Sequence, residues 1–321
     1  MKKLFLSIFC SLCVVTSAYS QDDTEIKPIP NKVEYNKEKA ELGKKLYHDT
    51  LLSADGTISC ASCHMLHKGG VDNLQVSKGI KGQKGGMNSP SVYNSANNFV
   101  QFWDGRAKNL EEQALGPVEN PVEMGDKWEN VVKKVSANAE YKKSFDKIYA
   151  GKVTKENIAN AIAEFEKTLI TPDSKFDKFL KGNKNALTFQ EKRGYQLFQD
   201  YGCTTCHNGT YLGGNSYQTM NEEYFKDRGN ITSNDYGRFN VTKDEADKYS
   251  FKVPSLRNVD LTAPYFHDGN VKTLDEAVKL MGKYQLGVEL KPDEIKAISA
   301  FLKTLTGKYE GVDLDKVKEV K

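Results

Sequence analysis

The chain has little cysteine, few long apolar runs and hardly any excess of charge. Six cysteines occur in 321 residues. Cys10 and Cys13 lie in the first 20 residues, and the other four form two Cys-x-x-Cys pairs, which leaves none for a disulfide. One apolar run, residues 4–15, is too short to span a bilayer comfortably. Basic residues number 46 and acidic residues 43, without a basic stripe, which argues against nucleic-acid binding.

Each cysteine pair is followed directly by a histidine. The motifs read CASCH at residues 60–64 and CTTCH at residues 203–207. In this pentapeptide the two thiols add to the vinyl groups of a c-type haem, and the histidine ligates its iron. A zinc site would need both pairs to converge on one ion in tetrahedral geometry, and a histidine after each second cysteine does not suit it. The sequence therefore predicts two covalently attached haem c groups.

The first 20 residues predict a cleaved secretory signal. Lys2 and Lys3 form a short positive region, the apolar run follows, and Ala18 and Ser20 offer small residues just before Gln21. Covalent haem attachment takes place outside the cytoplasm, which agrees with export. We therefore expect a mature chain from about Gln21 in a Gram-negative periplasm.

The chain repeats itself loosely in two halves. A predicted helix with leucine and aromatic residues on one face precedes each motif, at residues 41–47 and 192–198. An amphipathic helix closes each half, with apolar residues at spacings of three or four. These residues are Ile158, Ile162, Phe165 and Leu169 in the first half and Ile295, Ile298, Phe301, Leu302 and Leu305 in the second. The closing helices are expected to start at residues 154–157 and 292–294.

An entering helix, a haem motif and a closing helix make up a cytochrome c domain. Since strand signals are weak throughout, we predict an all-α protein of two such domains. Helical periodicity stops near residues 171–173, which divides the mature chain into residues 21–172 and 173–321. Residues 78–98 and 208–250 show no clear period, and long loops of this kind are usually functional or mobile.

Six short blocks stand out between about Glu41 and Gly307. They are GVDNL at 70–74, FWDGR at 102–106, PVENPVEM at 117–124, VPSLRN at 253–258, PYFHDG at 264–269 and MGKYQLG at 281–287. In content and order these blocks resemble the bacterial dihaem cytochrome c peroxidases, over nearly the whole mature chain. The resemblance implies reduction of hydrogen peroxide to water with electrons from small periplasmic cytochromes c or cupredoxins. It also implies a homodimer.

The resemblance implies a division of labour between the two haems. The N-terminal haem would be the low-potential peroxidatic site, and the C-terminal haem the high-potential electron-transfer site. One motif would hold each haem: Cys60, Cys63 and His64 the first, and Cys203, Cys206 and His207 the second. Met281 would be the second axial ligand of the C-terminal haem, since a thioether opposite histidine raises the potential. Methionine is more often a core filler, but the context MGxxQLG favours the ligand.

Further residues take roles by the same resemblance. Trp103, one of two tryptophans, would lie between the haems and help electron transfer. Arg106, Arg257 and His267 would be propionate or interdomain contacts. Asn88 and the backbones of Thr262 and Pro264 would form a calcium site between the domains, since calcium prefers oxygen ligands. By this resemblance Trp103 belongs to the catalytic machinery, whereas Arg106, Arg257 and His267 would take no part in the chemistry.

Cleavage of peroxide needs a proton shuttle and a polar neighbour beside the iron. The resemblance assigns the shuttle to Glu123 and the neighbour to Gln113. Without it, Glu123 would be one more solvated surface carboxylate. The acid must be tuned by burial for this role.

The chain departs from the family at Ile80. Many members carry a histidine here, which caps the peroxidatic iron in the oxidised enzyme. Isoleucine has no lone pair for iron, so we predict a five-coordinate or water-bound haem that needs no prior reduction. His67, Met87 and Met124 remain candidate substitute ligands, and His48 is expected to be an exposed residue at a helix end.

Two other functions stay open at this point. The chain could be a relative of the dihaem enzyme that matures methylamine dehydrogenase by oxidising tyrosine and tryptophan on a partner protein. That enzyme uses tyrosine where this chain has Met281, which speaks against it. A non-enzymatic electron carrier with two saturated haems is the second alternative, and it would not bind peroxide.

Overall fold

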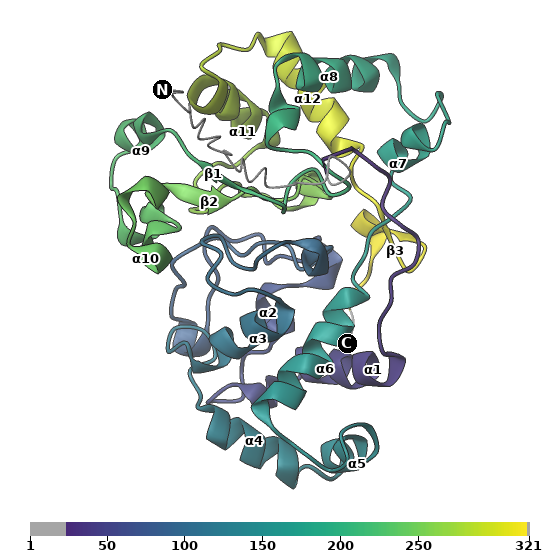
Figure 1. The fold of residues 1–321 in the computed structure, drawn as a ribbon, viewed down its shortest axis with the longest axis vertical. Helices are drawn as coiled ribbons and strands as arrows, with labels where there is room; N and C mark the ends of the chain where they lie inside the picture. Colours follow the sequence, from purple (N-terminus) through teal and green to yellow (C-terminus); the bar gives the residue numbers. More distant parts are fainter. Residues whose placement is uncertain (1–23, 320–321) are drawn as a thin grey trace, which may run out of the picture.

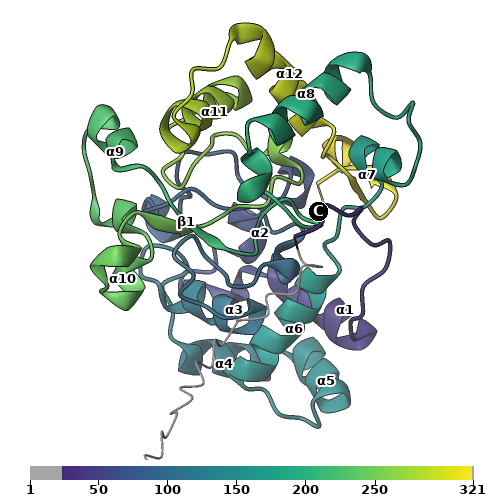
Figure 2. The ribbon, with the colours of Figure 1, turned by 45° about the horizontal axis from the view of Figure 1, so that its top comes forward.

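The structure is a computed structural model that describes residues 24–319, so the predicted signal at residues 1–20 lies outside it. Helices dominate the described chain, and two lobes are visible in Figures 1 and 2. The helices of the first lobe are α1 (Lys37–His48), α2 (Cys60–Cys63), α3 (Leu110–Glu119), α4 (Trp128–Ala137), α5 (Ala139–Ile148) and α6 (Lys155–Lys167). Those that follow are α7 (Lys175–Leu180), α8 (Phe189–Asp200), α9 (Glu222–Arg228), α10 (Phe239–Thr242), α11 (Leu274–Leu280) and α12 (Pro292–Lys303). The prediction of two helical cytochrome c-type domains is confirmed.

The predicted entering and closing helices are confirmed as packed pairs. In the first lobe α1 packs against α6, and in the second α8 packs against α12. A glycine permits each close approach: a Cβ on Gly43 would lie 1.8 Å from the Ala161 carbonyl oxygen, and one on Gly194 would lie 1.9 Å from that of Ala297. Each half of the loose repeat therefore contains an equivalent pair of closely packed helices.

The helix starts follow ordinary capping chemistry. The Thr154 hydroxyl accepts a hydrogen bond from the Asn157 backbone N–H at 3.2 Å, and α12 begins with Pro292 in its first turn. The predicted starts of both closing helices are thus confirmed. His48 does end α1, but it is half-buried beside Tyr47 and Phe165, so the prediction of an exposed residue was wrong.

Short strands, which the sequence did not predict, lie in two antiparallel pairs. β1 (Tyr217–Thr219) pairs with β2 (Ser250–Lys252), and β3 (Lys308–Tyr309) pairs with β4 (Val312–Asp313). The first pair closes a loop within the 208–250 segment, which also contains α9 and α10 and so is less irregular than the sequence suggested. Pairs this short give almost no periodic signal, because alternation needs four residues or more to be recognised.

Each end of the described chain packs on the opposite lobe. Near the start, the Ile29 backbone N–H donates to the Asp177 carboxylate at 3.1 Å. Near the end, Tyr309 and Leu314 belong to the apolar core of the first lobe, where Tyr309 meets the ring of Tyr93 edge-on. These crossings hold the lobes together. Within residues 24–319, no helix has the length and apolar character to cross a bilayer.

Candidate functional site

A cavity of about 700 Å³ in the first lobe contains the first haem motif. Cys60 and Cys63 are the ends of α2, and His64 follows directly. His64 Nδ1 lies 3.1 Å from the Pro90 carbonyl oxygen, which accepts its proton and leaves Nε2 for a metal. Burial lowers the pKa of His64, so the ring stays neutral as a ligand must. This donor set and cavity fit a covalent haem.

A second cavity, of about 290 Å³, contains the other motif. His207 Nδ1 lies 3.2 Å from the Leu212 carbonyl oxygen, so Nε2 is again the free nitrogen. Burial lowers the pKa of His207 to about 4. Met281 lines the same cavity as Cys203, Cys206 and His207, at the point where α11 passes into a π-helical turn, Met281–Leu286. The two motifs thus account for two haem c groups, and a thioether is at hand in one of the cavities.

Gln113 and Glu123 both line the N-terminal cavity with His64. Gln113 stands on α3, and Glu123 lies in the turn that follows this helix. Asn120 Nδ2 donates to Glu123 Oε1 at 2.8 Å, which fixes the direction of the carboxylate. Burial raises the pKa of Glu123, opposed by the Arg106 charge and the Asn120 hydrogen bond. The structure therefore brings the predicted acid and its polar neighbour into the cavity of the first motif.

The segment around Ile80, where many family members have a histidine, is hydrogen-bonded to the Glu123 turn and packs closely on it. The Ile80 backbone N–H donates to the Glu123 carbonyl oxygen at 2.8 Å. A Cβ on Gly79 would lie 2.1 Å from the Val122 carbonyl oxygen, so only glycine lets the two segments approach this closely. The Ile80 side chain is buried, and its Cδ1 atom would be 2.3 Å from a Cβ on Gly125. Ile80 thus packs on the turn behind Glu123.

Two of the candidate substitute ligands line the same cavity, namely Met87 and Met124. Met124 is 3% exposed and packed into the core of the first lobe, whereas Met87 is half-buried in the irregular segment. Among the described residues that line the cavity, His67 is not found. Met87 is therefore the better placed of the spare ligands.

Trp103 lines both cavities. Its indole Nε1–H donates to the Asn88 carbonyl oxygen at 2.9 Å, and its own carbonyl oxygen accepts the Lys252 backbone N–H at 2.8 Å. These bonds tie the indole ring between a loop of the first lobe and strand β2. Trp103 is thus common to the linings of the two cavities, and its place between the haems stays a prediction.

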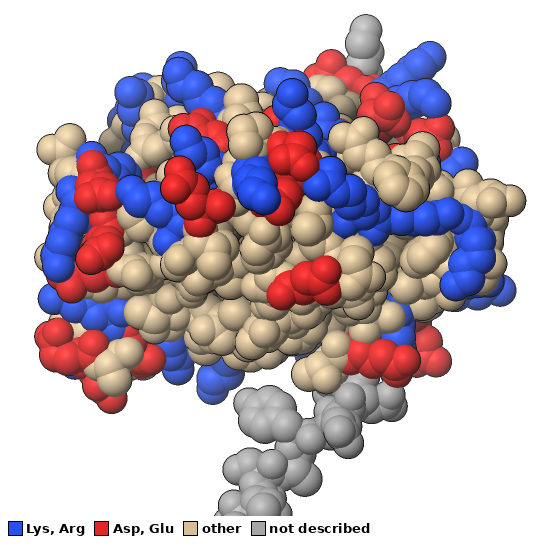
Figure 3. All heavy atoms as spheres, turned by 90° about the horizontal axis from the view of Figure 1, so that it is seen from above, with Lys and Arg blue, Asp and Glu red and all other residues tan. Residues whose placement is uncertain are grey.

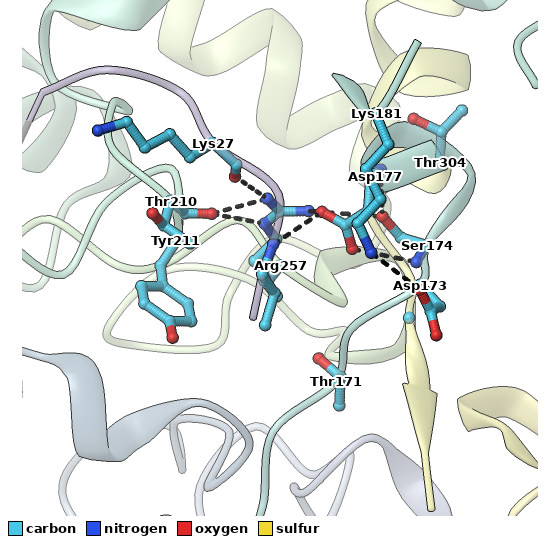
Figure 4. Close-up of polar contacts among 12 residues, drawn as sticks. Lys27, Thr171, Asp173, Ser174, Asp177, Lys181, Thr210, Tyr211, Arg257 and Thr304 are labelled. Atoms are coloured by element: carbon cyan, nitrogen blue, oxygen red, sulfur yellow. Dashed lines mark hydrogen bonds and ion pairs between the residues drawn. The ribbon is translucent and has the colours of Figure 1, made fainter. Parts of the chain in front are cut away.

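Arg257 is buried and its guanidinium is bound by protein acceptors (Figure 4). Nη1 pairs with the Asp177 carboxylate at 2.8 Å, with both side chains fully buried. Nη2 donates to the Lys27 carbonyl oxygen at 3.0 Å, and Nε and Nη2 both donate to that of Thr210. The residue lines the C-terminal cavity, but its hydrogen bonds join the N-terminal segment to α7.

His267 is held in an ionic network of the second lobe. Its Nε2 lies 2.7 Å from Asp235 Oδ1, and its ring stacks on Phe251 at 4.4 Å. Arg228 binds both Asp235 and Asp268, so this cluster of two acids and a histidine already has its cation. Within the described chain, His267 is not among the residues lining either cavity. Its carbonyl oxygen accepts the Asn88 backbone N–H at 2.8 Å, a contact between the lobes.

Asn88, Thr262 and Pro264 all line the C-terminal cavity. The Asn88 amide nitrogen donates to the carbonyl oxygens of Leu74 and Gln75, at 2.9 and 3.3 Å. The Asn88 side-chain oxygen is therefore the atom left for a further partner. The three residues of the predicted calcium site thus share one cavity lining.

Sequence reasoning missed two buried charged residues at these cavities. Glu166, on α6, lines the N-terminal cavity and is 6% exposed; burial and the nearby Glu111 raise its pKa to about 8. Its place four residues after Ile162, on the apolar face of the helix, could have revealed it. Lys252, on β2, is 6% exposed and lines both cavities. No periodic signal marked it, because β2 is too short.

Comparisons with known proteins agree with this geometry. The family described as "Di-haem cytochrome c peroxidase" matches residues 37–185, and the family described as "Cytochrome c" matches residues 191–306. The chain is 51% identical over 306 residues to "Cytochrome c peroxidase Ccp" of Escherichia coli (strain K12), covering 93% of this chain and 66% of that protein. It therefore spans just under two thirds of the length of that relative.

A second relative is matched over more of its length. The chain is 50% identical over 283 residues to "Cytochrome c551 peroxidase" of Nitrosomonas europaea, covering 88% of this chain and 84% of the relative. Among solved structures, a MauG-like protein associated with microbial copper homeostasis superposes with a TM-score of 0.78 at 28% identity. That match covers 90% of this chain and 95% of the other.

Proposed function

Because this chain belongs to the di-haem cytochrome c peroxidase family and is by that membership a cytochrome-c peroxidase acting on hydrogen peroxide, we propose that its N-terminal cavity is where peroxide is reduced. One observation carries this proposal: Glu123, Gln113 and His64 line one cavity of about 700 Å³. A haem bound there supplies the iron that binds peroxide and cleaves its O–O bond. The rest of the site belongs to the protein.

Glu123 is the proton shuttle. As a carboxylate it accepts the proton of the peroxide oxygen nearer the iron, and it returns this proton to the oxygen that leaves as water. Burial raises its pKa, which brings the two protonation states closer in energy near neutral pH, and the Asn120 hydrogen bond keeps the carboxylate aimed. Gln113 stabilises charge that develops on the leaving oxygen. Reduction to two waters consumes two protons and two electrons.

A haem held by Cys203, Cys206 and His207 would accept electrons from a small redox protein, with Trp103 on the path to the first cavity. Met281, as a thioether ligand, would raise the potential of that haem, which suits this role. Trp103 lines both cavities and so offers an aromatic ring between them. The proposed boundaries, residues 21–172 and 173–321, assign one haem to each domain.

Small periplasmic cytochromes c or cupredoxins are the proposed donors, and the periplasm the proposed location. On the face seen in Figure 3, basic and acidic side chains are mixed around an area with few charges. A mixed surface of this kind suits the small, short-lived contacts of electron transfer. Calcium at Asn88, Thr262 and Pro264, and a homodimer, belong to the same proposal.

The proposed resting state is open to peroxide, because Ile80 has no lone pair for iron and packs on Gly125. The test is peroxide-dependent oxidation of a reduced small cytochrome c by the fully oxidised protein and by a sample whose C-terminal haem was reduced beforehand. Equal, rapid turnover is expected. Turnover only after reduction would mean that a substitute ligand caps the iron, with Met87 the first candidate. No turnover in either sample would remove the peroxidase proposal.

A further inference from the structure

Lys252 is a buried cation at the boundary between the two cavities. It ends strand β2, and its backbone N–H is bonded to the Trp103 carbonyl oxygen at 2.8 Å. Like Trp103, Lys252 lines both cavities. Among the lining residues that the structure describes, it is the charged residue common to both.

The Lys252 ammonium is buried without an anion. The residue is 6% exposed, and among residues 24–319 its side chain makes no hydrogen bond or ion pair. The N-terminal cavity is lined by three acids: Asp104, which is paired with Arg106 at 3.0 Å, Glu123, which is bonded to Asn120, and Glu166. Within residues 24–319, no ion pair joins any of the three to Lys252. The described residues that line the C-terminal cavity include no aspartate or glutamate.

Arg257 is another buried cation, and its charge is paired within the protein. Its guanidinium has the Asp177 carboxylate and two backbone carbonyls as partners (Figure 4). A buried charge is costly unless it is paired and hydrogen-bonded. Burial alone lowers the pKa of Lys252 to about 8, which expresses that cost. Lys252 therefore needs an anion that the protein does not supply.

We propose that the Lys252 ammonium forms an ion pair with a haem propionate at the boundary between the two cavities, beside Trp103, and that this charge raises the potential of the haem it touches. The inference rests on the two haem sites of the proposed function. Propionates are the anionic groups that a haem brings into such a cavity. A fixed positive charge favours the ferrous state, because reduction removes one positive charge from the iron centre. Lys252 would thus be a cofactor-binding residue that also sets a potential on the electron path.

The experiment is a spectroelectrochemical titration of both haems in the purified dihaem protein. Lys252→Met and Lys252→Gln are expected to shift the ferric–ferrous equilibrium of at least one haem about tenfold toward ferric, which is about 59 mV for one electron. Lys252→Arg retains the positive charge, so its midpoint potential is expected to stay close to the wild-type value. Lys143→Met, on the exposed face of α5, is the control for loss of a distant lysine.

Midpoints within error of the wild type in both neutral variants would overturn the inference, as would an arginine variant as low as the neutral ones. Peroxide turnover of the same wild-type sample separates the two proposals. If turnover is absent but the midpoint shifts, the proposed function fails and the role of Lys252 stands. If turnover is present but the midpoint does not shift in the Lys252 variants, the proposed function stands and the role of Lys252 fails.

Discussion

The two haem cavities share the same kind of attachment residues and differ in the rest of their linings. Each has two cysteines and a histidine whose Nδ1 faces a backbone carbonyl oxygen, at 3.1 and 3.2 Å. The N-terminal cavity, of about 700 Å³, is also lined by Gln113 and Glu123, whereas the C-terminal cavity, of about 290 Å³, is lined by Met281. The comparison teaches that the attachment motif and its helix pair form a common scaffold, and that the two cavities differ in the side chains that other segments add to it.

The buried charges divide in the same way. The N-terminal cavity is lined by Glu123 and Glu166, two carboxyls whose pKa values burial raises. The C-terminal cavity has no acid among its described lining residues and keeps the charge of Arg257 paired with Asp177. Among the described lining residues, the two cavities therefore differ in the buried carboxyl groups that they present.

The largest expected effect comes from removing the acid of the N-terminal cavity. Glu123→Gln should slow peroxide reduction by about 10²–10⁴-fold and leave both haem spectra unchanged, because the proton shuttle is lost. In the wild type, activity should rise with pH over a range above that of an exposed glutamate, because burial raises the pKa and the carboxylate is the active form. Steady-state rates against pH measure both.

Glu119→Gln is the matched control, since Glu119 is exposed at the end of α3, the helix that precedes the Glu123 turn. It should leave the rate and its pH profile intact. Unchanged turnover in Glu123→Gln would take this residue out of the mechanism.

The second effect concerns the axial position of the C-terminal cavity. Met281→Ala should lower the potential of one haem by on the order of a tenth to a few tenths of a volt, within the roughly 0.8 V that axial ligands span. The potential of the other haem should stay close to the wild-type value. Met220→Ala, in a methionine that lines the same cavity, is the control. A high potential that survives in Met281→Ala would show that another group is the ligand.

The third effect tests whether the position of the Glu123 turn depends on the close approach of Gly79. In Gly79→Ala the new Cβ would lie 2.1 Å from the Val122 carbonyl oxygen and 2.5 Å from that of Glu123, so the turn must move. We expect a loss of about 1–3 kcal/mol of stability and a lower rate of peroxide reduction. Denaturant titration and steady-state kinetics measure the two. Gly85→Ala is the control: its Cβ would lie 3.5 Å from the nearest atom, so neither stability nor the rate should fall. If Gly79→Ala and Gly85→Ala had the same stability and rate, the close packing of Gly79 on the Glu123 turn would not matter for activity.

The last effect is on stability against pH, and it is the most remote from peroxide reduction. Glu166 has a pKa of about 8 in the folded protein and 4.5 as the reference value, so between these values the folded state binds up to one more proton than the unfolded state. Stability should therefore fall as pH rises through this window, by up to about 1.4 kcal/mol per pH unit from this group. Glu166→Gln should flatten the slope in urea titrations at pH 5, 6.5 and 8. Glu156→Gln, in an exposed residue of the same helix, should keep it. An unchanged slope in Glu166→Gln would place the titrating proton elsewhere.

Much of the fold was predictable because it depends on local patterns. The spacing of Ile158, Ile162 and Phe165 places them on one face of α6, and Thr154 caps its start, as expected from the sequence. The strands escaped prediction because β1 and β2 are three residues each and are separated in the chain by residues 220–249, which include α9 and α10. His48 was expected to be exposed because a helix end usually is, yet the ring of Phe165 lies beside it.

The sequence by itself determined the two haem motifs, the paired helices and the family, since each depends on residues close together in the chain. Only the tertiary structure decided which distant residues share a cavity: Glu123 with His64, Met281 with His207, and Lys252 with both linings. The physical reason is that burial and pairing of a charge depend on neighbours from other elements. A lysine between Phe251 and Val253 reads the same in a sequence whether it lies in water or against a haem propionate.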